Sequence, residues 1–130
     1  MQHVTTYGGC RIIDLPAAVR EAEDGPEFSA KVLEKTGLRL HVIDGSEEAR
    51  LSAQGVLLGW PDAEGIVCDI GGNSMELALV SKGAIGKRVS LPLGPFRLQL
   101  VEGGAVALRK HIRRILSEAK ELIGAKHERI

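Results

Sequence analysis

The chain has 130 residues; 44% are hydrophobic, 26% are charged, and 17 basic residues balance 17 acidic ones to a formal net charge of zero. This composition is typical of a globular protein with one modest core, and it argues against a disordered chain and against a dedicated nucleic-acid binder. No apolar run approaches the length of a membrane span, so we expect no membrane partner. Cys10 and Cys68 lack a metal-binding spacing, and we expect both to be small buried residues of a reduced cytoplasmic protein, with a disulfide as the open alternative.

The first half of the chain predicts a β-α-β arrangement. Periodicity and turn residues indicate a strand at 10–14, helices at 17–22 and 28–36, a strand at 38–43 and a helix from 46 to about 58. The segment 59–64 is rich in turn-forming residues, and we place the boundary between two half-domains at its end. Residues 1–64 and 65–130 are therefore expected to belong to different half-domains.

The second half begins with a predicted β-hairpin. Apolar runs at 66–68 and 77–80 flank the turn-forming sequence Gly-Gly-Asn-Ser at 71–74. Backbone N–H groups in such a turn can point into one concavity, which is how proteins cradle phosphate oxygens. Asp69, at the end of an expected buried strand, is suitably placed to hold Mg²⁺. The alternative is an ordinary tight hairpin in which Asp69 and Ser74 only cap the turn.

The remaining residues predict a third strand and a long helix. The strand covers 84–91, a short helix follows at 96–101, and apolar spacing indicates an amphipathic helix over 105–123. Its opposite side carries basic residues, which we interpret as a solvated face rather than an anion-binding surface: Arg109, Lys110, Arg113 and Arg114.

Four stretches of the chain match a known family in the same order. Asp-Ile-Gly-Gly-Asn-Ser-Met-Glu at 69–76 resembles the second phosphate loop of the exopolyphosphatase and guanosine-pentaphosphate phosphohydrolase family (Ppx/GppA). The other three are Ala-Ala-Val-Arg-Glu-Ala at 17–22, Val-Ile-Asp-Gly-Ser-Glu-Glu-Ala-Arg at 42–50 and Ser-Leu-Pro-Leu-Gly at 90–94. That family belongs to the actin, Hsp70 and sugar-kinase superfamily.

The resemblance implies a partial ribonuclease-H-like (actin-like ATPase) fold of the α/β class. A β-α-β piece is followed by a β-meander and a helix. Residues 1–64 would be the C-terminal part of the first half-domain, and residues 65–130 the N-terminal part of the second. The implied activity is Mg²⁺-dependent hydrolysis of inorganic polyphosphate or guanosine pentaphosphate.

Glu48 is the strongest candidate for a catalytic residue. By position alone, its carboxylate complements the dipole at the start of a helix. The resemblance implies a different role, because the second glutamate of Gly-Ser-Glu-Glu-Ala matches the residue that activates the attacking water in this family. Glu47 is then the solvated neighbour.

The other candidate residues hold phosphate or metal. Arg20 has a guanidinium suited to phosphate contact, and its alternative is an exposed helix charge paired with Glu23 or Asp24. The resemblance implies that Asp69 and Glu76 lie at the metal, although Glu76 as a strand residue facing solvent is the open alternative. The phosphate loop itself is implied to be Gly71, Gly72, Asn73 and Ser74.

Several positions depart from the family pattern. Asn73 replaces a usual third glycine, which the turn tolerates because Asn adopts positive φ more readily than most residues. Met75 replaces threonine and removes a hydroxyl donor. The family's first phosphate loop, Asp-x-Gly-Ser-Asn-Ser, is absent, so we expect the chain to resemble the middle of a family member.

Three functions follow as hypotheses. The first is a phosphoanhydride hydrolase or a fragment of one, with activity lowered by orders of magnitude without the first loop. The second is a weak or inactive module that binds polyphosphate or guanosine tetraphosphate or pentaphosphate. The third is an actin-like assembly module that forms homo-oligomers through exposed sheet edges.

Overall fold

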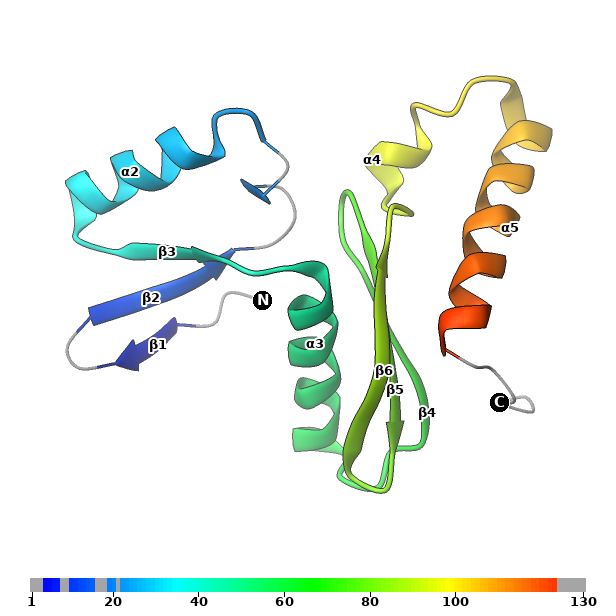
Figure 1. The fold of residues 1–130 in the computed structure, drawn as a ribbon, viewed down its shortest axis with the longest axis horizontal. Coiled ribbons are helices and arrows are strands. Elements are labelled where there is room, and N and C mark those ends of the chain that lie inside the picture. Colours follow the sequence, from blue (N-terminus) through cyan, green and yellow to red (C-terminus); the bar gives the residue numbers. More distant parts are fainter. Residues whose placement is uncertain (1–3, 8–9, 16–18, 21, 124–130) are drawn as a thin grey trace. The chain divides into compact units, whose positions relative to one another are not determined.

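The computed structural model describes residues 4–7, 10–15, 19–20 and 22–123 (Figure 1). These form two compact units, Met1–Asp44 and Gly45–Ile130. None of the described helices combines the length and apolar character that crossing a membrane requires.

The first unit is a three-stranded sheet with one helix. Strand β1 (Val4–Tyr7) pairs antiparallel with β2 (Cys10–Leu15), and β2 pairs in parallel with β3 (Arg39–Val42). Helix α2 (Gly25–Thr36) connects β2 to β3 and runs beside β3 in Figure 1. The predicted β-α-β arrangement is therefore confirmed.

Two features of this unit differ from the prediction or lie outside it. Strand β1 was not predicted, because its sequence Val-Thr-Thr-Tyr carries no apolar alternation. Half of the helix predicted at 17–22, namely residues 17, 18 and 21, lies outside the described residues; Val19 and Arg20 are helical, and Ala22 is not.

The second unit contains a β-meander between two helices. Helix α3 (Gly45–Gly59) is followed by strands β4 (Gly65–Ile70), β5 (Met75–Ser81) and β6 (Ala84–Leu91), which pair antiparallel in that order. A short helix α4 (Pro95–Leu98) and a long helix α5 (Gly104–Ile123) complete it. All of these elements were predicted to within a few residues.

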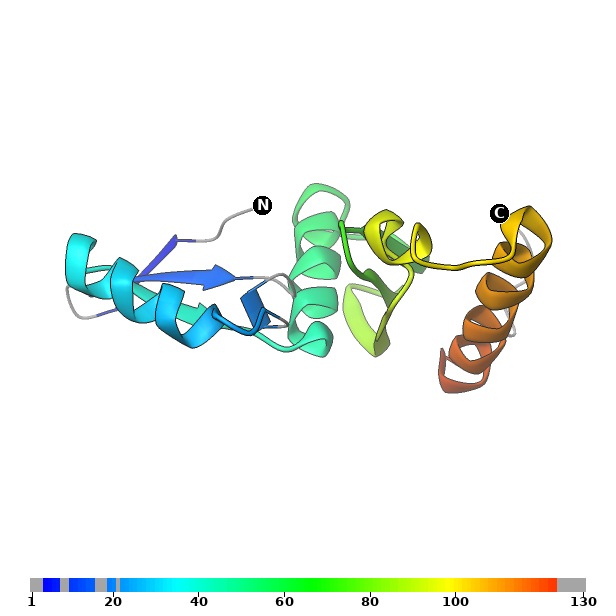
Figure 2. The same cartoon turned by 90° about the horizontal axis from the view of Figure 1, so that it is seen from above.

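The two faces of the meander are covered by different helices, as Figures 1 and 2 show. Ala78 and Val80 of the central strand β5 pack with Ala49 and Ala53 of α3. Residues on the other face of the sheet pack against α5 in a second cluster, in which Leu91, Leu93, Ile115 and Ala119 are buried and Met75, Leu77 and Val89 are partly buried. Alternation along β5 therefore divides the core into two layers.

Strand β4 is an edge strand, and this corrects two expectations. Its residues Ile66 and Ile70 are 41% and 64% exposed, so the strand that ends near Asp69 is not buried. Cys68 is a free and exposed cysteine rather than a small buried residue, because β4 has a strand neighbour on one side only. The expectation for Cys10 lies outside the described side chains.

The compact units divide at Asp44 and Gly45, before α3, whereas the half-domain boundary predicted from the sequence lies after residue 64. Helix α3 contacts all three strands of the meander, which is why it groups with the second unit. The assignment of 1–64 and 65–130 to two half-domains of a larger fold stays a prediction.

Candidate functional site

A row of polar side chains crosses the meander on the face covered by α3. Asp69 of β4 is the cross-strand partner of Glu76 of β5, which in turn pairs with Ser90 of β6. The Ser90 hydroxyl donates to Glu76 Oε1 at 2.6 Å, and Glu76 is only 2% exposed. The alternative in which Glu76 faces solvent is therefore wrong.

Helix α3 reaches this row through Ser52. Its hydroxyl donates to Asp69 Oδ2 at 2.6 Å, which joins the helix to the end of β4. Glu48 precedes Ser52 by four residues, so it lies on the same helix face about 6 Å further toward the N-terminus. Glu48 is half-buried, and its Oε2 atom is removed from solvent. Three predicted site residues, Glu48, Asp69 and Glu76, thus belong to one face of the second unit.

The carboxylates of Asp69 and Glu76 are neighbours on this face. Partial burial, and after it their negative charges, raise the pKa of the Cys68 thiol, which neighbours Asp69 along β4 and by strand alternation points to the opposite face of the sheet. Two carboxylates on adjacent strands are hard oxygen donors, and Mg²⁺ is typically held by one or two carboxylates together with water and substrate phosphates. The pair therefore fits Mg²⁺, although within the described residues no three Asp, Glu, His or Cys side chains form a metal-binding group.

The turn 71–74 is held by hydrogen bonds on its carbonyl side. Gly71 N–H donates to the Ser74 carbonyl at 2.9 Å, Gly94 N–H to the Asn73 carbonyl at 3.2 Å, and Phe96 N–H to the Gly72 carbonyl at 2.9 Å. Among the described residues, no backbone carbonyl accepts from the N–H groups of Gly72, Asn73 or Ser74. These amides are the donors that a phosphate loop requires.

Asn73 does not need the conformational tolerance that its sequence suggested. Among the described residues, Lys82 is the one non-glycine residue with positive φ, so Asn73 adopts an ordinary backbone conformation. The replacement of the family's third glycine therefore causes no backbone strain at this position.

Arg20 lies in the first unit. Its Nη1 donates to the backbone carbonyl of Ile43 at 2.6 Å, and the residue is half-buried. A guanidinium bound to the residue that follows β3 is not simply an exposed helix charge. Its predicted phosphate contact stays a prediction.

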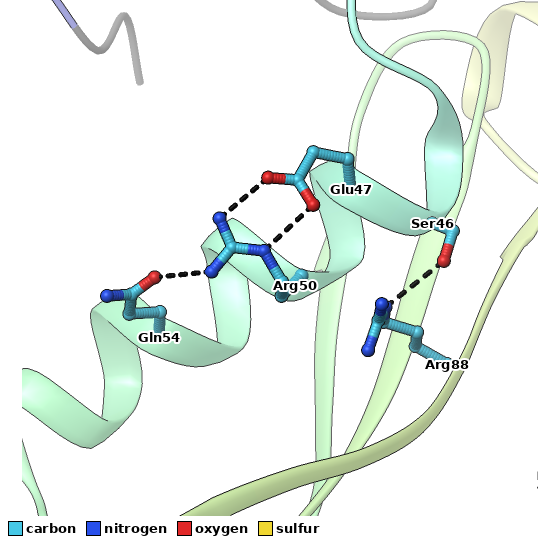
Figure 3. A network of polar contacts seen from close by, with 5 residues as sticks. All are labelled: Ser46, Glu47, Arg50, Gln54 and Arg88. Carbon is cyan, nitrogen blue, oxygen red and sulfur yellow. Dashed lines mark hydrogen bonds and ion pairs between the residues drawn. The ribbon is translucent and has the colours of Figure 1, made fainter. Parts of the chain in front are cut away.

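A polar network surrounds the first turns of α3 (Figure 3). Arg50 donates to both carboxylate oxygens of Glu47, at 2.8 and 2.6 Å, and to Gln54 at 2.7 Å. The hydrogen bond to Glu47 raises the pKa of Arg50 above its ordinary value. Glu47 is thus paired within its own helix rather than a merely solvated neighbour. Arg88 Nε donates to Ser46 at 3.1 Å, which ties β6 to the start of α3.

Sequence reasoning missed several residues that organise the site. Ser52 had a usable signal, since it lies four residues after Glu48 on a predicted helix. Ser90 and Gly94 stand in the family-like stretch 90–94, but nothing in their local pattern indicates contacts with Glu76 or with the turn 71–74. Those contacts depend on strand register and on the path of the chain after β6.

The fold of the chain is similar to that of solved exopolyphosphatase and Ppx/GppA family structures. A crystal structure of an exopolyphosphatase from Cytophaga hutchinsonii matches with a TM-score of 0.75 and 25% identity, over 85% of this chain and 39% of that chain. The Ppx/GppA family member from Aquifex aeolicus matches with a TM-score of 0.58 and 25% identity, over 83% and 36% respectively.

Sequence comparison agrees with the structural one. The profile of the Ppx/GppA phosphatase family matches residues 16–125, so the chain belongs to this family. It is 39% identical over 84 residues to exopolyphosphatase 1 of Mycobacterium leprae, which covers 63% of this chain. Identity to exopolyphosphatase 1 of Mycobacterium tuberculosis is 34% over 84 residues, again 63% of this chain. The chain spans about a quarter of the length of these relatives, 25% and 24%.

Proposed function

We propose that the chain is part of a Mg²⁺-dependent phosphoanhydride hydrolase that releases inorganic phosphate from polyphosphate. Family membership supports phosphatase chemistry. The observation that carries the proposal is the common face of Glu48, Asp69 and Glu76, which the Ser52–Asp69 hydrogen bond joins. A general base beside a pair of metal-binding carboxylates is the arrangement that in-line attack of water on phosphorus requires.

The proposed step assigns one role to each candidate residue. Glu48 orients a water and accepts its proton while the water oxygen bonds to the terminal phosphorus and the anhydride P–O bond breaks. Asp69 and Glu76 would hold Mg²⁺, which supplies charge neutralisation for the phosphate oxygens when bound. Phosphate oxygens would be held by the turn Gly71, Gly72, Asn73 and Ser74, and a phosphate contact of Arg20 stays a prediction from the family resemblance. The products are inorganic phosphate and a polyphosphate that is one phosphate shorter.

Polyphosphate is the substrate that we favour. Both sequence relatives and one of the two structures reported above are named exopolyphosphatases, and an extended chain of phosphates needs only hydrogen-bond donors to its anionic oxygens for recognition. Guanosine pentaphosphate stays a prediction from the family resemblance. Neither a purely binding module nor an assembly module is favoured, because the carboxylates that hydrolysis requires are retained.

Two further expectations stay predictions. The exposed edge of β4 is where association between copies would occur. A cytoplasmic location is likewise predicted from composition alone.

The decisive experiment is phosphate release from long-chain polyphosphate with Mg²⁺, comparing the chain with Glu48→Gln. We expect slow release that Glu48→Gln abolishes and that a chelator stops. Glu47→Gln is the matched control, since it removes the adjacent carboxylate but keeps an acceptor for Arg50. Equal release by Glu48→Gln and the unmodified chain would contradict the role of Glu48. No release by the unmodified chain would exclude a hydrolase that works alone.

A further inference from the structure

The segment that follows β6 binds the carbonyl side of the turn 71–74. Gly94 and Phe96 stand some twenty residues further along the chain, yet their N–H groups donate to the carbonyls of Asn73 and Gly72. Two backbone hydrogen bonds to neighbouring peptides fix the orientation of both peptide planes. The turn is therefore attached to the rest of the sheet by Gly94–Phe96 as well as by its own strands.

This attachment determines where the amides of the turn point. No peptide bond among the described residues is cis, and in a trans peptide the carbonyl of one residue and the N–H of the next point in opposite directions. With the Gly72 carbonyl directed at Phe96, the N–H of Asn73 points away from that segment. Because the Asn73 carbonyl is directed at Gly94, the N–H of Ser74 also points away from that segment. Two donors consequently face the side opposite to Gly94–Phe96.

Close packing at Gly94 makes the contact specific. A Cβ atom at this position would lie 2.3 Å from the Asn73 carbonyl carbon and 2.4 Å from the Gly72 carbonyl oxygen. The backbone angles of Gly94, φ −67° and ψ 148°, are open to any residue, so the glycine is needed for space and not for conformation. The three nearest atoms are all backbone atoms, which cannot rotate away as a side chain can.

Gly72 is a milder version of the same contact. A Cβ at Gly72 would lie 2.8 Å from two ring carbons of Phe96. Phe96 is 64% exposed, so its ring has solvent to turn into. An added methyl group at Gly72 is therefore accommodated more easily than one at Gly94.

We propose that Gly94 and Phe96 are positioning residues, which hold the turn 71–74 so that the Asn73 and Ser74 N–H groups meet a phosphate group of the substrate. The inference rests on the proposed function for the identity of the ligand. Its structural part concerns the turn alone and is measurable without ligand. Both residues act through the backbone of the turn, and neither is assigned a contact with substrate.

The test replaces three glycines by alanine, one at a time; the three positions differ in how much room they leave for the added methyl group. Gly94→Ala meets backbone, Gly72→Ala meets a movable ring, and Gly86→Ala on β6 meets Leu79 atoms at an ordinary 3.6 Å. Binding of tripolyphosphate with Mg²⁺ is measured by calorimetry. Gly94→Ala is expected to weaken binding by about 10- to 100-fold, the loss of one or two hydrogen bonds to a charged group. Gly72→Ala should be intermediate, and Gly86→Ala should bind as the unmodified chain does.

A rescue separates positioning from general damage. Phe96→Ala in the Gly72→Ala chain removes the ring that the new methyl group meets, while the backbone N–H at position 96 remains. We expect tripolyphosphate affinity to return to within about twofold of that of the unmodified chain, a difference well below 1 kcal/mol. If the double variant does not recover tripolyphosphate affinity, the steric account is contradicted. This comparison does not need Gly94→Ala, so it remains decisive even if that variant does not fold.

Amide chemical shifts of Asn73 and Ser74 without ligand test the structural part independently. They should change in Gly94→Ala and stay unchanged in Gly86→Ala. If the shifts follow this order but the unmodified chain does not bind tripolyphosphate, the proposed function fails and the attachment stands. If Gly94→Ala leaves both shifts and the affinity unchanged, the inference is overturned.

Discussion

At the scale of single residues, the thiol of Cys68 reports the charge of the candidate site. Burial, Asp69 and Glu76 all raise its pKa, so the folded protein holds the thiol proton more tightly than an ordinary cysteine does. In a Cys10→Ser chain, we expect the rate of Cys68 alkylation by iodoacetamide to increase at a higher pH than the rate for an ordinary thiol of pKa 9.0. The rate is measured against pH by mass spectrometry.

Two variants identify the source of this shift. Asp69→Asn removes one of the negative charges and should move the alkylation profile of Cys68 to lower pH. Glu64→Gln, on the exposed connector before β4, should leave it in place. The same sign applies to stability: because the unfolded chain loses the thiol proton first, this group lowers the free energy of unfolding as pH rises above its ordinary pKa. If the pH profile of Cys68 alkylation is the same in Asp69→Asn as in the parent chain, the charge of Asp69 does not contribute to the raised pKa.

The buried carboxylate of Glu76 makes Ser90 a stability determinant. Its hydroxyl is a hydrogen-bond donor to a side chain that is 2% exposed. Ser90→Ala should lower the free energy of unfolding by about 1–3 kcal/mol, because it deprives a buried acceptor of its donor. Urea denaturation measures the change, and Ser81→Ala at the exposed end of β5 should stay within about 0.5 kcal/mol.

A double-mutant cycle then measures the interaction free energy between Ser90 and Glu76. In a Glu76→Gln chain the buried charge is gone, so Ser90→Ala should cost less than it does beside the carboxylate. Equal costs in both chains would show that Ser90 stabilises the protein through packing and not through Glu76.

At the scale of elements, α3 approaches the meander closely because its contact residues are small. Ala53 is fully buried against Ala78 and Val80, on the helix that also carries Glu48 and Ser52. Ala53→Leu adds side-chain volume to a filled layer and should lower the free energy of unfolding by about 1–3 kcal/mol. Leu58→Ala, at a side chain 79% exposed, is the control and should change little.

The same variant should affect the site. Moving α3 away from the sheet lengthens the Ser52–Asp69 hydrogen bond and displaces Glu48 from Asp69 and Glu76. Phosphate release should therefore fall by more than the loss of folded protein explains, which circular dichroism at the assay temperature quantifies. Unchanged release per folded molecule would indicate that the position of α3 does not limit the reaction.

Elements with a local cause could be predicted from the sequence. The meander follows from apolar runs separated by turn residues, and Lys82-Gly83 adopts the positive φ angles of a tight hairpin turn. Helix α5 follows from its amphipathic spacing. Strand β1 lacks such a pattern and exists because its backbone pairs with β2. The exposure of Cys68 and Ile70 was missed for a related reason: which strand lies at an edge is decided by pairing partners, not by the strand itself.

Across the whole molecule, the candidate site was only partly predictable. The residues Glu48, Asp69 and Glu76 could be named from family resemblance, and strand alternation is consistent with their common face. The contacts that organise them join residues far apart in the sequence, such as Ser52 with Asp69 and Gly94 with Asn73. Their geometry depends on register and on the close approach of backbones, for which the sequence contains no local signal.

The two compact units should also differ in stability. Among the side chains that the structure describes, both buried hydrophobic clusters lie in Gly45–Ile130, whereas those of residues 19–20 and 22–44 include one buried apolar side chain, Ile43. Helix α2 even exposes Phe28 and Leu33, at 48% and 45%. Because local opening is governed by buried apolar contact, amides of α2 and β3 should exchange with deuterium before those of β5 and α3. Hydrogen-exchange mass spectrometry measures this order directly. Simultaneous exchange of both units under native conditions would mean that the chain opens as one cooperative body, which would contradict this prediction.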